Sequence, residues 1–338
     1  MATRTRPLAL ALAALLLPAV LLLPAGAGAA PVEVDPAIEP YEKVSGVSGN
    51  LNSIGSDTLN NLMTLWSEGF RRQYPNVRIQ VEGKGSSTAP PALIAGTAQL
   101  GPMSRSMKNT EIDAFEEKFG YGPTPIRVAI DALAVYVHKD NPLDGLSIPQ
   151  VDAIFSATRR CGHPGSIETW DEVGLSARFQ NQPISLYGRN SASGTYGYFK
   201  KVALCGGDYR DRVKEQPGSA SVVQGVTEDL FGIGYSGIGY ITSGVKALPL
   251  AEEEGEPFAS TDPESVYSGE YPLARFLYVY INKKPNAPLD PLVEQFVRYV
   301  LSREGQQIVV KDGYLPISQA VAAQEKEKLT GAAVASRP

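Results

Sequence analysis

The sequence has few of the residues that usually hold metals, with two cysteines and two histidines among 338 residues. His138 and His163 show no ligand spacing, so we expect no metal site and no cofactor. Cys161 and Cys205 would form one disulfide in an oxidising compartment. Two free thiols are the alternative, and the sequence leaves both open.

Positive charge is also in short supply. The chain has 31 Lys and Arg against 36 Asp and Glu, a formal net charge of −5. An acidic surface argues against a nucleic-acid partner, because the phosphate backbone is recognised by cationic side chains. It does not exclude a small anion, because a closed cleft responds to local dipoles more than to net charge.

Long apolar runs are missing after the first thirty residues, so we expect no membrane span. The exception, residues 8–23, follows Arg4 and Arg6 and precedes small residues at 27–29. This order predicts a signal peptide at 1–29 and a soluble, periplasmic or secreted mature protein. A membrane anchor is the alternative, but the run is shorter than the roughly 20 residues that a span needs.

Apolar spacing alternates between strand and helix periods along the chain, which predicts an α/β protein. Two long apolar strands, 126–138 and 275–282, are the candidates for crossings between two lobes. The predicted organisation is an N-terminal extension at 30–49, lobe one at 50–130 and 271–325, lobe two at 131–250, a surface loop at 251–270 and a tail at 326–338.

Three segments share the order strand, Gly/Ser turn, helix. They are Gly55-Ser56-Asp57-Thr58, Gly85-Ser86-Ser87-Thr88 and Ser193-Gly194-Thr195. The first N–H groups of a helix have no internal partner, and the helix dipole places positive charge there, so such ends bind phosphate-like anions. Simple helix capping by Ser, Thr and Asp is the alternative for each segment taken alone.

Arg189 stands four residues before Ser193. A guanidinium group can grip two oxygens of a tetrahedral anion and stays charged at every relevant pH. A surface salt bridge is the alternative for this residue.

These residues resemble the periplasmic phosphate-binding proteins of phosphate ABC transporters, over about residues 50–316. The markers are GSDTL, GKGSST, QLGPMSR, the long strand containing Asp131, AIFSA to Trp170, RNSASGT, GIGYSGIGY and GYLP. The resemblance implies a two-lobed type II periplasmic-binding-protein fold with two crossing strands as hinge. It also implies a monomer that binds inorganic phosphate and delivers it to the membrane permease of an ABC transporter. The predicted phosphate-binding set is Asp57, Thr58, Leu59, Ser86, Ser87, Arg105, Asp131, Arg189, Ser193, Gly194 and Thr195.

Two departures from the family pattern bear on selectivity. Many members have a Ser-Asp pair where this chain has Ser104-Arg105, and some carry an Asp that pairs with the arginine where this chain has Ser191. A carboxylate that accepts the proton of hydrogen phosphate rejects sulfate. Asp57 and Asp131 are the candidates, and we expect Asp131 to meet Arg105, Arg189 or the ligand, because a lone buried carboxylate is costly.

Three other functions are weighed against this one. If neither Asp57 nor Asp131 reaches the ligand, sulfate or another tetrahedral oxyanion becomes the ligand. A secreted phosphate-ester hydrolase would need a nucleophile with a base in reach or a metal set, so we do not expect an enzyme. A sensor is the third alternative, because the fold alone does not decide function.

Overall fold

The computed structural model describes residue 1 and residues 32–330. The predicted signal peptide at 1–29 therefore lies outside the described residues, apart from residue 1, and so does most of the predicted tail. None of the described helices is long and apolar enough to cross a membrane.

Helices and strands alternate as the apolar spacing predicts. The helices are α1 Asn60–Gln73, α2 Ala89–Ala95, α3 Asn109–Phe119, α4 Ile148–Phe155, α5 Gly194–Val202, α6 Ser219–Glu228, α7 Pro263–Ser268, α8 Pro291–Val300, α9 Arg303–Lys311 and α10 Gln319–Thr330. The strands are β1 Gly49–Gly55, β2 Val77–Gly83, β3 Gly101–Met103, β4 Thr124–His138, β5 Leu146–Ser147, β6 Ser185–Arg189, β7 Lys214–Gln216, β8 Gly232–Gly237, β9 Val245–Ala247, β10 Leu250–Ala251 and β11 Ala274–Ile281.

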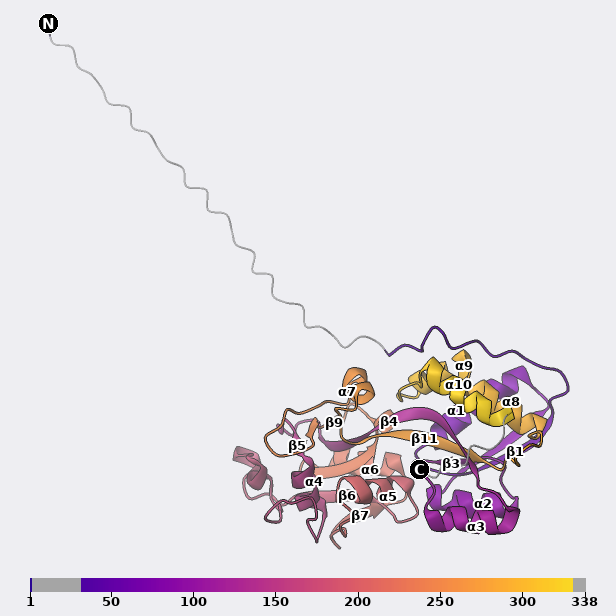
Figure 1. The fold of residues 1–338 in the computed structure, drawn as a ribbon. Coiled ribbons are helices and arrows are strands. Elements are labelled where there is room, and N and C mark those ends of the chain that lie inside the picture. Colours follow the sequence, from indigo (N-terminus) through magenta and orange to yellow (C-terminus); the bar gives the residue numbers. More distant parts are fainter. Residues whose placement is uncertain (2–31, 331–338) are drawn as a thin grey trace. The chain divides into compact units, whose positions relative to one another are not determined.

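One seven-stranded sheet connects the protein, in the order β3-β11-β4-β8-β6-β7 with β9 paired to β4. β4 and β11 are antiparallel and run side by side along its middle (Figure 1). β1 and β2 form a separate parallel pair. The sheet is thus continuous through the two longest strands.

The two largest of the four hydrophobic cores in the described residues lie along β4 and β11, and these two define the lobes. Ile126, Val128 and Leu277 belong to the first core, with the apolar face of α1. Leu133 and Val135 of β4 belong to the second core, and Ala274 of β11 packs against it. Both strands therefore pass from one core to the other, which confirms the predicted crossings.

The two cysteines form a disulfide, with 5.4 Å between the Cα atoms of Cys161 and Cys205. This confirms the bridge and removes the alternative of two free thiols. The bridge joins residues separated by 44 positions in the sequence, within the second lobe.

Three segments differ from the sequence prediction. The region 251–270 is not all loop, because Asp262 accepts a hydrogen bond from the Ser265 N–H and begins α7. The segment 231–241, whose alternation of glycine with apolar residues predicts a buried strand, is a strand only over Gly232–Gly237, and a 3-10 turn follows. The predicted tail overlaps α10, whose buried Glu325 binds Arg127. The helix α10 was hidden from local patterns because its buried Glu325 pairs with a residue far along the chain.

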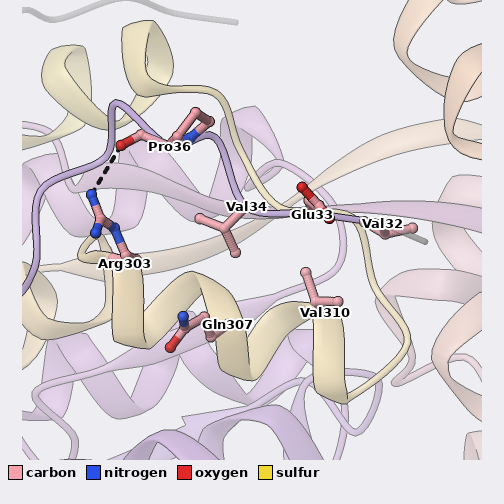
Figure 2. A pocket seen from close by; sticks show the side chains of 7 residues that line it. All are labelled: Val32, Glu33, Val34, Pro36, Arg303, Gln307 and Val310. Atoms are coloured by element: carbon pink, nitrogen blue, oxygen red, sulfur yellow. Dashed lines mark hydrogen bonds between the residues drawn. The ribbon is translucent and has the colours of Figure 1, made fainter. Parts of the chain in front are cut away.

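The N-terminal extension packs on the first lobe. Arg303 donates from Nε to the carbonyl of Ile38 at 3.0 Å and from Nη2 to that of Pro36 at 2.9 Å, and Ile38 is 1% exposed. Figure 2 shows this segment lying across α9, with Val34 beside a hollow of about 370 Å³. The segment has no periodicity because two carbonyls and a few apolar side chains hold it, not a regular face.

Candidate functional site

Four buried hydroxyl groups from four different turns meet between the two lobes. The Oγ1 atoms of Thr58 and Thr195 are 2.9 Å apart. Ser104 Oγ lies 3.5 Å from Thr195 Oγ1 and 3.3 Å from Ser86 Oγ. All four residues are at most 1% exposed. We call these four residues the hydroxyl cluster; Ser104 is the member that the predicted site set missed.

Helix starts surround this cluster. α1 begins at Asn60 without a side-chain cap, while Ser193 caps α5 by accepting from the N–H groups of Thr195 and Tyr196. Ser193 therefore caps its helix, which was the alternative to anion binding for this segment. Ser86 opens the 3-10 turn that leads into α2.

Glycine allows the two lobes to approach closely here. A Cβ atom on Gly194 would lie 2.2 Å from Ser86 Oγ and 2.6 Å from Ser104 Oγ. Gly85 has φ of 114°, and a Cβ atom there would lie 2.4 Å from the carbonyl oxygen of Ala192. Any larger residue at either position would force the turns apart.

Arg189 is buried at 1% exposure and bonds to groups of both lobes. Its Nη1 donates to Ser219 Oγ at 2.7 Å, and its Nη2 lies 3.1 Å from Asp57 Oδ2. Burial lowers the pKa of Arg189, and the Asp57 carboxylate opposes that shift. The Nε atom is buried with no hydrogen-bond partner among the described residues. A buried donor of this kind suits an anion ligand.

Asp57 uses the same oxygen for both of its contacts. Oδ2 also accepts the N–H of Ser219 at 2.8 Å. The Asp57 carboxylate therefore reaches from the first lobe to the arginine and a helix start of the second. Asp57 takes the place, in charge, of the family aspartate that is missing at Ser191.

Neither of the two arginines expected beside Asp131 is its partner. Within the described part of the chain, Asp131 pairs instead with Arg275, whose Nε and Nη2 lie 3.0 and 2.7 Å from Oδ2. Its Oδ1 accepts the N–H of Ile238 at 3.0 Å. Both oxygens of this fully buried carboxylate are thus engaged within the protein.

Sequence reasoning missed Arg275 as a site residue. Its Nη2 donates to Thr195 Oγ1 and its Nη1 to the carbonyl of Ser104, both at 2.9 Å. The sequence did contain a signal for this residue. β4 carries a negative charge at Asp131 and β11 a positive charge at Arg275, and the antiparallel register places these two residues directly opposite each other. The pair holds two members of the hydroxyl cluster in place.

Arg105 is neither exposed nor bonded to the hydroxyl cluster. It is 8% exposed, and its two Nη atoms each lie 2.7 Å from an oxygen of Glu111. Of the remaining predicted residues, Leu59 packs its side chain in the first core, so only its backbone is available. Ser87 donates from N and Oγ to the carbonyl of Ala192 in the other lobe.

Buried tyrosines orient the turns that carry these groups. Tyr240 donates to the carbonyl of Asp57, and Tyr314 donates to that of Thr58, both at 2.9 Å. Tyr235 accepts the N–H of Arg189. Burial raises the pKa of all three phenols, so they remain neutral donors.

Two lobes on a pair of crossing strands, with a buried polar cluster between them, define a solute-binding protein of the type II class. A family model described as a PBP superfamily domain matches residues 42–304. Over 304 residues the chain is 59% identical to Phosphate-binding protein PstS of Pseudomonas aeruginosa, covering 90% of this chain and 94% of the relative. The chain therefore belongs to the phosphate-binding proteins of the periplasmic-binding-protein superfamily.

More distant relatives agree with this family. The Bacillus subtilis protein of the same name is 29% identical over 276 residues, covering 80% of this chain and 82% of the relative. An ABC-type phosphate transport receptor from Vibrio cholerae has a TM-score of 0.60 at 21% identity, covering 79% of this chain and all of that one. The second likeness shows the fold.

Proposed function

We propose that the protein captures inorganic phosphate between its lobes, outside the cytoplasmic membrane, and delivers it to the permease of an ABC transporter. The observation that carries this proposal is the hydroxyl cluster beside Arg189. Hydroxyl groups both donate and accept, and a buried guanidinium compensates negative charge where water is excluded. The four predicted residues nearest the anion are Thr58, Ser86, Arg189 and Thr195, to which we add Ser104.

We assign the proton acceptor for hydrogen phosphate to Asp57. Asp131 already accepts from Arg275 and from Ile238, whereas Asp57 makes both of its contacts through Oδ2. Its Oδ1 is then the carboxylate oxygen that can receive the ligand proton. This revises the preference for Asp131 drawn from the sequence.

The protein binds phosphate without transforming it. The relatives carry the names of binding and transport proteins. Within the described residues, His138 Nδ1 accepts the Asp140 N–H and His163 Nδ1 contacts the carbonyl of Gly165, and neither of these contacts is with the hydroxyl cluster. No group of three metal-binding side chains occurs in the part of the chain that the structure describes.

Isothermal titration with phosphate and with sulfate tests the proposal. We expect one phosphate per protein, bound more tightly than sulfate, and no turnover of p-nitrophenyl phosphate. Tighter binding of sulfate than of phosphate would make sulfate the ligand, and the assignment of the fold would not change. Release of p-nitrophenol at an enzymatic rate would instead favour the hydrolase.

A further inference from the structure

A hollow of about 660 Å³ lies between the two lobes beside the hydroxyl cluster. One wall is the turn at 105–109 of the first lobe, the other is α5 of the second, and β11 also lines it. Its lining includes Arg105 and Lys108 of the turn, Lys201 of α5 and Arg275 of β11.

The hollow is cationic although the chain is acidic. Four of its thirteen lining residues are Arg or Lys and none is Asp or Glu, in a chain with a net charge of −5. Glu111 and Asp131 compensate the two arginines. The surplus charge belongs to Lys108 and Lys201, which are exposed and come from opposite walls.

The hollow is connected to the hydroxyl cluster through shared residues. Arg275 lines it and donates to Thr195 Oγ1 at 2.9 Å. Arg105 lines it and directly follows Ser104 in the sequence. The hollow thus borders residues that contact or adjoin the hydroxyl cluster, namely Arg275 and Arg105.

We propose that this hollow is the route by which the anion reaches the hydroxyl cluster, and that Lys108 and Lys201 capture it there. The inference rests on the proposed phosphate function. A cleft lined by one sign of charge raises the local concentration of an oppositely charged ligand and its association rate. Because the lysines lie on opposite walls, they act on the anion before the buried cluster encloses it. The two lysines therefore change the association rate of the anion but not its dissociation rate.

The variant Lys108→Gln/Lys201→Gln tests this role in the full mature protein. Equilibrium dialysis with radiolabelled inorganic phosphate gives the Kd, rapid filtration after a chase with unlabelled phosphate gives the dissociation rate, and their ratio gives the association rate. At low salt we expect association to slow by about threefold to tenfold with dissociation unchanged. The difference should shrink in about 1 M salt, where the Debye length is about 3 Å.

Lys284→Gln/Lys311→Gln is the matched control, since it removes the same charge from exposed lysines outside the hollow. Equal association rates in both double variants would overturn the inference, as would a faster dissociation. Two phosphates bound per wild-type protein, falling to one in the hollow variant at an unchanged association rate, would make the hollow a separate site and also overturn it. A wild-type protein that binds no phosphate would overturn the proposed function itself.

Discussion

At the scale of single residues, the site replaces the water around the anion with hydroxyl and charged groups of the protein. Bonds within the protein hold all of the charged and polar groups of the site, which are the four hydroxyl groups, Arg189, Arg275, Asp57 and Asp131. Each of these ion pairs balances its own charge before any ligand arrives. A bound anion is then stabilised chiefly by oriented dipoles and by the remaining donor capacity of Arg189.

Replacing Arg189 with alanine should abolish most phosphate binding. The change leaves the Asp57 carboxylate and the bound anion without their shared cation, and breaking a buried pair costs about 3–5 kcal/mol. Isothermal titration measures the loss. Arg298→Ala, which removes a surface pair with Glu294, should bind as the wild type does. Near-normal affinity in Arg189→Ala, with a native circular dichroism spectrum, would place Arg189 outside the site.

Asp57→Asn should lower phosphate affinity more than sulfate affinity. The amide keeps the shape but no longer attracts the proton of hydrogen phosphate, and it no longer repels an anion that has no proton. We expect the ratio of the two affinities to fall by about tenfold, the effect of about 1.4 kcal/mol. Asp131→Asn should weaken both anions alike, and the opposite ranking of the two variants would make Asp131 the acceptor.

At the scale of elements, the site is made where strands end and helices begin. β1 leads to α1, and β6 leads to α5, and the turns before these two helices meet where Thr58 Oγ1 lies 2.9 Å from Thr195 Oγ1. The close approach of these starts depends on glycine at the contact. The apolar face of α1 and the cap of α5 are local features, whereas the convergence of the two helix starts is not.

Gly194→Ala should weaken phosphate binding without destabilising the ligand-free protein. Alanine suits a helix, but its Cβ would lie 2.2 Å from Ser86 Oγ in the other lobe. Gly197→Ala on the same helix is the matched control, since its Cβ would be 3.5 Å from the nearest atom. Titration and thermal unfolding separate the two effects. Equal affinity in both variants would show that the lobes need not approach this closely.

Asp312 should make the junction of α1 and α9 sensitive to pH. Burial raises the pKa of Asp312 to about 6, against the opposing hydrogen bond from Asn61. The folded protein thus favours the neutral acid, and the stability gained from it is present below about pH 4 and lost as the pH rises through about 6. The unfolding free energy of Asp312→Asn minus that of the wild type should therefore rise by about 2–3 kcal/mol between pH 4 and pH 7.5.

Urea unfolding at the two pH values measures that gain. Asp211→Asn, at an exposed position, controls for the general effect of removing a carboxylate. A variant-minus-wild-type difference in unfolding free energy that does not change with pH would contradict the prediction.

At the scale of the whole molecule, contacts between the lobes describe a closed arrangement around the site. Thr58 meets Thr195, Ser87 meets Ala192, and Asp57 meets Arg189 across the boundary. β4 and β11 join the two cores covalently and through the sheet. This is the architecture of hinge closure about a ligand.

Phosphate should therefore make the protein more compact. In small-angle X-ray scattering we expect the radius of gyration to fall when phosphate is added, and not when an equal ionic strength of chloride is added. Thermal unfolding should shift upward as phosphate rises, because the ligand binds the folded state alone. An unchanged radius with a clear thermal shift would mean that the lobes stay closed without ligand.

Local order in this protein follows from short-range patterns. Apolar periods predict the two crossing strands and α1, and Gly, Ser and Thr after a strand predict the helix starts, because these depend on neighbours within a few residues. Arg189 is found for the same reason, as a cation in one such turn. The sequence does not predict the buried helix α10 or the packing of the N-terminal segment, because their partners lie far along the chain.

Pairing among the charges was decided by tertiary structure. The sequence by itself determined that two aspartates and several arginines stand near Gly/Ser turns. Only the antiparallel register of β4 with β11 joins Asp131 to Arg275, and only the approach of the lobes joins Asp57 to Arg189. The physical reason is that ion pairs form by distance in space, which the spacing of residues along the chain does not encode.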